Sequence, residues 1–229
     1  MVNARKFRWK NLILFVLLAV LAVSTSYRSS PLNLSAQMTS SPSAVLDTNT
    51  KASGLRVVLN SLNKQHVDLA AEAMRDGYDG FGSEAFKAST HTLDNNSVAM
   101  ANLMGSLYGT DTSNKFLEVW RKHIDSYMNY TLAIKNNDGS ERSRAMSDLS
   151  NQAEQLASLL SAVNPDIQKD AVKQMMVERA QLMLAVINAR AAGDWQASYD
   201  MQDAAYNQIG QFADGLAAVI VRQFPEKFQ

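Results

Sequence analysis

The sequence predicts an all-α protein, a six-helix up-and-down bundle built from three helical hairpins. The chain of 229 residues has only four prolines, and none lies between Pro42 and Pro165. Beyond Gly54, apolar residues recur at three- and four-residue spacing, and five helix-breaking segments divide this pattern into six parts. Because the breaks are short, neighbouring helices must run antiparallel.

The N-terminal segment has the form of a targeting signal. Residues 11–27 carry no charge, and their apolar centre is Leu12–Val23. We expect residues 1–27 to be either a signal peptide, cleaved after Ser24, or an N-terminal membrane anchor. In both cases the remainder is extracytoplasmic, either secreted or held at the cytoplasmic membrane, because the basic residues before the apolar run stay inside. These are Arg5, Lys6, Arg8 and Lys10.

Residues 28–54 have the composition of a tether. They include seven serines, three threonines and two prolines, without a sustained helical period. We expect a flexible linker here, followed by a helical bundle domain over residues 55–229.

The first hairpin is predicted from Leu55 to Gly109. Its first helix begins at Leu55 and ends in a glycine-rich break, Asp76–Gly82. The spacing of acidic residues in this break does not fit a calcium loop. Its second helix is expected over about 83–107, before the terminating Gly109.

Two more hairpins follow the same plan. The third helix begins near Ser113 and ends at the turn Asn136–Gly139, and the fourth covers about 141–163. The fifth runs from about Ile167 to the break at 192–194, and the sixth ends at Phe224. The shared positions of the breaks favour an internal threefold repeat.

Three polar residues interrupt the apolar faces of the first helix in each predicted hairpin. His66, His123 and Glu178 occupy similar places at intervals of 57 and 55 residues. Two imidazoles and a carboxylate could ligate zinc, copper or iron, or line a pocket for a small ligand. They could also be structural core residues, paired with polar groups on the second helices. Counting back 14 residues from each terminal Gly or Pro identifies those partners as Asn95, Asn151 and Gln211.

Several function classes lack support. The absence of cysteine excludes disulfides and thiolate chemistry. Outside the N-terminal basic cluster the chain is mildly acidic, with scattered Lys and Arg, so we expect no nucleic-acid partner. No Gly-x-Ser-x-Gly elbow and no phosphate-binding loop is present, and we find no recognisable catalytic site.

Three segments resemble a known group of proteins: Leu93–Ser97, Phe116–Ile124 and Ile220–Phe228. They are similar to an uncharacterised helical domain of secreted and envelope proteins from spore-forming Gram-positive bacteria. The resemblance spans Leu55 to Phe228. Some members are called copper amine oxidase after a neighbouring N-terminal module, which this chain lacks, so the resemblance implies no oxidase activity. It also implies a histidine where Glu178 stands.

The sequence therefore favours an extracytoplasmic binding or interaction module that meets a cell-envelope protein, with contact to the membrane if the N-terminal segment is retained. The alternative is a metal- or small-ligand-binding bundle that uses His66, His123 and Glu178.

Overall fold

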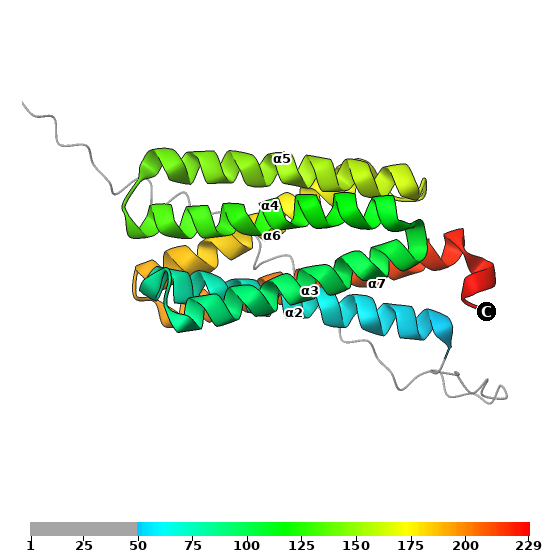
Figure 1. Ribbon diagram of the computed structural model, residues 1–229, viewed down its shortest axis with the longest axis horizontal. Coiled ribbons are helices and arrows are strands. Elements are labelled where there is room, and N and C mark those ends of the chain that lie inside the picture. The colour runs from blue at the N-terminus through cyan, green and yellow to red at the C-terminus, as the bar shows by residue number, and fades with distance from the viewer. Residues whose placement is uncertain (1–49) are drawn as a thin grey trace, which may run out of the picture. The chain divides into compact units, whose positions relative to one another are not determined.

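The computed structural model describes residues 50–229, and this part of the chain is helical without β-strands. The all-α up-and-down bundle is confirmed (Figure 1). The elements are α2 (Lys51–Gly80), α3 (Glu84–Tyr108), α4 (Thr110–Lys135), α5 (Gly139–Val163), α6 (Lys169–Ala191), α7 (Trp195–Gln223) and the 3₁₀ helix η1 (Pro225–Lys227). The predicted signal or anchor, and the linker up to residue 49, lie outside the described residues.

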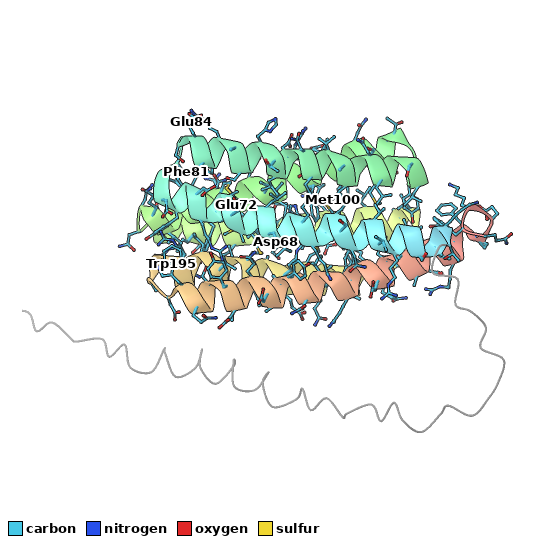
Figure 2. The ribbon with its side chains drawn as sticks, turned by 90° about the horizontal axis from the view of Figure 1, so that it is seen from below. Asp68, Glu72, Phe81, Glu84, Met100 and Trp195 are labelled. Atoms are coloured by element: carbon cyan, nitrogen blue, oxygen red, sulfur yellow. The ribbon has the colours of Figure 1, made fainter. Side chains whose placement is uncertain are left out.

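The six helices form three antiparallel hairpins, α2–α3, α4–α5 and α6–α7. The first helices of the hairpins, α2, α4 and α6, contact one another in all three combinations and make up the centre of the bundle. Each second helix packs in sequence between two of them, and α7 closes the ring by packing on α2. Figure 2 shows that Phe81, Glu84 and Trp195 lie at one end of the bundle. The arrangement brings one face of three helices to a common axis.

Local sequence explains most helix starts. Ser83 and Asp194 cap α3 and α7, since their side chains accept hydrogen bonds from backbone N–H groups three residues later. Asp138 caps α5 by accepting from two successive N–H groups. The start of α4 has no side-chain cap and instead follows Gly109, whose φ is 89°.

The first helix differs from the predicted one at both ends. It begins at Lys51, where Thr50 caps it, so residues 51–54 belong to the bundle and not to the linker. It also continues through the expected break as far as Gly80. Gly77 is buried within the helix, and a Cβ atom there would lie 3.1 Å from the rings of Phe81 and Phe86. This glycine therefore serves close packing and does not end the helix.

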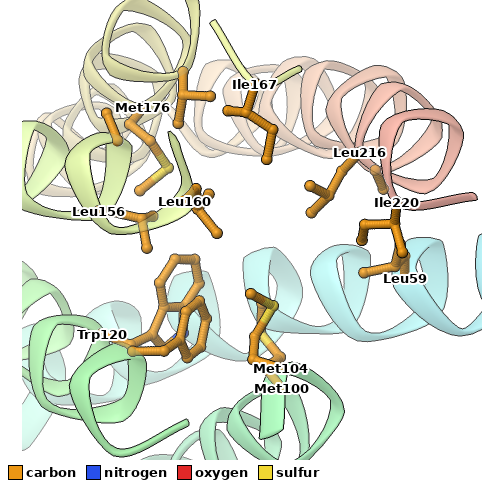
Figure 3. Packing of buried hydrophobic residues seen from close by; sticks show 14 of the residues in the cluster. Leu59, Met100, Met104, Trp120, Leu156, Leu160, Ile167, Met176, Leu216 and Ile220 are labelled. Carbon is orange, nitrogen blue, oxygen red and sulfur yellow. The ribbon is translucent and has the colours of Figure 1, made fainter. Parts of the chain in front are cut away.

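The apolar core has two parts. One cluster includes Leu59, Phe116, Leu156 and Ile220, and Figure 3 shows a close view of apolar packing that includes Leu59, Leu156 and Ile220. The second cluster occupies the other half of the bundle and includes Tyr127. Between the two clusters, the inner helices present polar side chains.

The turn between α3 and α4 provides a test of the fold. Replacing Gly109 by Ala should lower the free energy of unfolding by about 1 kcal/mol, because an L side chain is strained at positive φ. Gly215 is exposed within α7, and a Cβ there would meet nothing within 4 Å. Gly215→Ala should therefore raise the free energy of unfolding by about 0.5–1 kcal/mol. Urea unfolding of both variants measures the two effects, and equal responses would contradict the assigned turn.

Candidate functional site

A layer of buried polar side chains separates the two apolar clusters. The two central histidines, His66 on α2 and His123 on α4, have exposed fractions of 2% and 1%, and Arg179 on α6 has 1%. We call these three residues and their buried polar neighbours the polar layer. The neighbours are Asn63, Asn96, Ser97, Ser126 and Gln152.

Arg179 is the most unusual member of this layer, because its guanidinium is buried among neutral groups. Its Nη2 lies 3.4 Å from Nε2 of His123 and donates a hydrogen bond of 3.1 Å to Sδ of Met176. The guanidinium carbon lies 5.2 Å from the centre of the Trp120 ring, in a cation–π contact. Within residues 50–229, no carboxylate forms an ion pair with Arg179.

An aromatic row along α4 supports the layer from one side. The rings of Phe116 and Trp120 stack at 5.1 Å, and that of His123 lies 5.5 Å from Trp120 and 4.5 Å from Tyr127. These spacings follow from the helical repeat, because residues three or four apart share a face. The Trp120 indole also reaches α2, where its Nε1 donates a hydrogen bond of 3.3 Å to Nδ1 of His66.

The hydrogen bonds assign the tautomers of the histidines. An indole N–H can only donate, so Nδ1 of His66 accepts and the neutral ring carries its proton on Nε2. A guanidinium N–H likewise only donates, so Nε2 of His123 accepts and its Nδ1 carries the proton. Both protonated nitrogens point to positions where the described residues provide no hydrogen-bond partner.

Burial fixes the charge state of the layer. Desolvation, assisted by the charge of Arg179, lowers the pKa of His66 to about 3 and the pKa of His123 well below its ordinary value. Burial raises the pKa of the Tyr127 hydroxyl to about 12, although the nearby charge of Arg179 acts in the opposite direction. At neutral pH both imidazoles and the phenol are therefore uncharged, and Arg179 alone is charged.

The layer contains more hydrogen-bond donors than it uses. Nη1 of Arg179 and the Tyr127 hydroxyl have no hydrogen-bond partner among the described residues, in addition to the two imidazole N–H groups. Two amide oxygens, on Asn96 and Gln152, are also unpartnered. Amide oxygens carry no net charge, so they cannot neutralise the guanidinium. The layer thus has the donor groups and the positive charge that suit a small anion.

The predicted convergence of His66, His123 and Glu178 is wrong for its third member. Glu178 is exposed on α6, where its carboxylate accepts a hydrogen bond of 2.8 Å from Gln174. The adjacent Arg179 takes the inward position, at intervals of 57 and 56 residues from the histidines. A guanidinium has no lone pair to offer a metal. No group of three metal-ligating residues gathers in residues 50–229, so the geometry gives zinc, copper or iron no such site there.

The predicted polar partners are each displaced by one residue. Asn95, Asn151 and Gln211 are exposed, and the positions that face inward are Asn96, Gln152 and Phe212. Asn96 donates hydrogen bonds of 3.1 Å to the Leu62 carbonyl and 3.0 Å to Gln65. Gln152 donates one of 3.0 Å to Ser126. Since a helix turns about 100° per residue, a shift of one position moves a side chain from the surface to the core.

No family model matches the chain, and no curated protein or solved structure shows significant similarity to it. The helices between Thr50 and Gln229 include none long and apolar enough to cross a membrane.

The neutral histidines make stability depend on pH. Their pKa values are lower in the folded than in the unfolded protein, so the unfolded chain binds more protons below pH 6.5. The free energy of unfolding should therefore fall as pH decreases from 6.5 to 5, by about 1.4 kcal/mol per pH unit for each histidine. Urea unfolding across this range measures the slope, and His66→Gln should reduce it by about half.

The range above pH 5 separates this effect from carboxylate titration. Hydrogen bonds from lysines and from Arg56 lower the pKa values of Glu154 and Asp214 to about 2, so their contributions are lost only at lower pH. His91 is exposed, and His91→Gln is the matched control. A slope that changes equally in the His66 and His91 variants would contradict the assignment.

Proposed function

We propose that this chain is an exported helical binding module that takes a small anionic ligand at the polar layer around Arg179. The N-terminal sequence supports export, and the resemblance to a domain of secreted proteins agrees with it. The separation of the apolar core into two clusters supports a ligand site at the middle of the bundle. In the exported protein, residues 28–49 provide the length that lets the bundle reach a partner or ligand away from the membrane.

The observation that carries the proposal is a buried guanidinium without an anionic partner. Removing a charge from water costs several kcal/mol, and a carboxylate commonly compensates that cost. Here the compensation comes from a thioether, an imidazole and an indole face, which are weaker acceptors than a carboxylate. A bound anion would supply the missing partner and would accept the free N–H groups of Arg179 and His123.

A purely structural layer makes a different prediction for the same residue. If Arg179 only fills space, an apolar side chain of similar length should be neutral or should stabilise the bundle by about 1–4 kcal/mol, without other consequence. If Arg179 binds an anion, the same change should also abolish any effect of the ligand. The two roles therefore differ in the response to ligand, and not in stability alone.

Anion binding can be measured by thermal unfolding of the full chain in sodium acetate against sodium chloride at equal ionic strength and pH 7.5. We expect acetate to raise the melting temperature in a saturable manner, reaching about 2.7 kcal/mol of stabilisation at a concentration 100 times the dissociation constant. Arg179→Met should remove this increment.

Arg144 lies at the surface, with 73% of its side chain exposed, so Arg144→Met is the matched control for a general salt effect. It should respond to acetate as the original chain does. An equal response in the Arg179 and Arg144 variants, or no response of the original chain, would contradict a site at Arg179.

Export can be tested in a bacterial host by analysing the N-terminus of the mature chain. Cleavage after Ser24 would leave Thr25 as the first residue, because Ala22 and Ser24 are the small residues that a signal peptidase reads. A retained anchor would leave the N-terminus intact in the membrane fraction, with the bundle accessible to protease from outside. An intact chain in the cytoplasm would contradict export.

A further inference from the structure

The structure contains a second feature beside the polar layer, a small apolar cavity of about 30 Å³. Leucine and methionine side chains and two aromatic rings line most of it, and Asn63 is its one polar lining residue among those described. Figure 3 shows several lining side chains, among them Met100, Met104, Leu156 and Leu160. The cavity is thus apolar on most sides and belongs to the first core cluster.

The cavity and the charge share a wall. Trp120 and Met176 both line the cavity, and both contact the guanidinium of Arg179, through the indole face and through a hydrogen bond of 3.1 Å to Sδ. Asn63 lies one helical turn before His66 on α2, so the polar layer begins at the edge of the cavity. An apolar space therefore meets an unpaired positive charge across two side chains.

We propose that the ligand of this site is a short-chain carboxylic acid, with its carboxylate at Arg179 and His123 and its alkyl chain in the apolar cavity. This inference rests on the proposed function, since it assumes that an anion binds at Arg179. The carboxylate would fit between Trp120 and Met176 and accept from the guanidinium and the imidazole N–H. A free inorganic anion would satisfy the charge but would leave the cavity empty.

The size of the cavity limits the chain. A space of about 10–15 Å³ holds one water-sized group by the same measure, so 30 Å³ accommodates two or three carbon atoms. The best ligand should therefore have about three or four carbons in total. Longer chains would have to displace side chains from a close-packed core, which is unfavourable.

A surface groove provides a route to the cavity. A space of about 260 Å³ lies over the N-terminal part of α6 and the C-terminal half of α7. Phe212 and Leu216 line both this groove and the inner cavity, so these two side chains separate the one from the other. A change of rotamer at Phe212, which is half-buried, would connect them.

The test is a series of straight-chain carboxylates, from acetate to hexanoate, titrated calorimetrically into the full chain, with 1-butanol as the uncharged match for butyrate. We expect the affinity to rise about fourfold for each methylene group from acetate to butyrate and then to level or fall. Butanol should bind at least tenfold more weakly than butyrate, because it lacks the charge that pairs with Arg179.

Two variants with opposite effects check the position of the alkyl chain. Leu103 is half-buried in the cavity wall, and Leu103→Phe should abolish the gain from acetate to butyrate while acetate still binds. Leu156→Ala should enlarge the cavity and move the optimum to hexanoate. The second variant keeps the inference testable if the first fails to fold.

The outcomes separate the two proposals. If all carboxylates bind equally and Arg179→Met abolishes binding, the short-chain acid is wrong and the anion site stands. If butanol binds as tightly as butyrate, the cavity acts without Arg179, and the short-chain acid is again wrong. If no carboxylate binds, both proposals fail.

Gly215→Met tests the route, since Gly215 lines the outer groove and has open space at its Cβ position. In stopped-flow measurements it should slow butyrate association and dissociation by the same factor and leave the affinity unchanged. Unchanged rates would rule out entry between α6 and α7.

Discussion

The burial of one unpaired guanidinium is the constraint on which the centre of this bundle depends. A charge in a low-dielectric interior favours neighbours that are polarisable or electron-rich, and Arg179 is surrounded by such groups. Its charge also helps to hold both histidines in the neutral form, because a second positive charge in the same layer would be repelled. The tautomers of His66 and His123 then follow from what Trp120 and Arg179 donate. One charged residue thus orders the hydrogen bonds of three helices.

The arrangement of helices explains why this layer can exist. The three inner helices contact one another, so residues on their facing sides are shielded by the three outer helices. Two outer helices contribute amides to the layer, Asn96 on α3 and Gln152 on α5, whereas α7 places Phe212 at the corresponding position. Phe212 packs against both apolar clusters, and it lines both the cavity and the surface groove. The departure from the amide pattern therefore coincides with the opening in the core.

Sequence patterns predicted the helices well and the inward face of each helix less well. Gly109 and the Asn136–Gly139 turn marked real helix ends, because their chemistry is local. Glu178 was chosen over Arg179 because a carboxylate suits a metal and a buried arginine is rare. Nor could the periodicity of α6 correct that choice, since this helix packs on four neighbours and has almost no amphipathic pattern. The cavity depends on side chains from several helices, so no single segment could indicate it.

The differences among the three hairpins favour a division of roles between them. In the first two, an imidazole on the inner helix stands beside an amide on the outer helix, which gives a neutral and partly paired layer. The third hairpin replaces the imidazole with Arg179 and the amide with Phe212. The first change introduces a charge that neutral neighbours compensate incompletely, and the second places an apolar side chain between the core and the surface. Both features that a small acid requires, an anchor for its carboxylate and an apolar approach, thus come from the hairpin that departs from the other two.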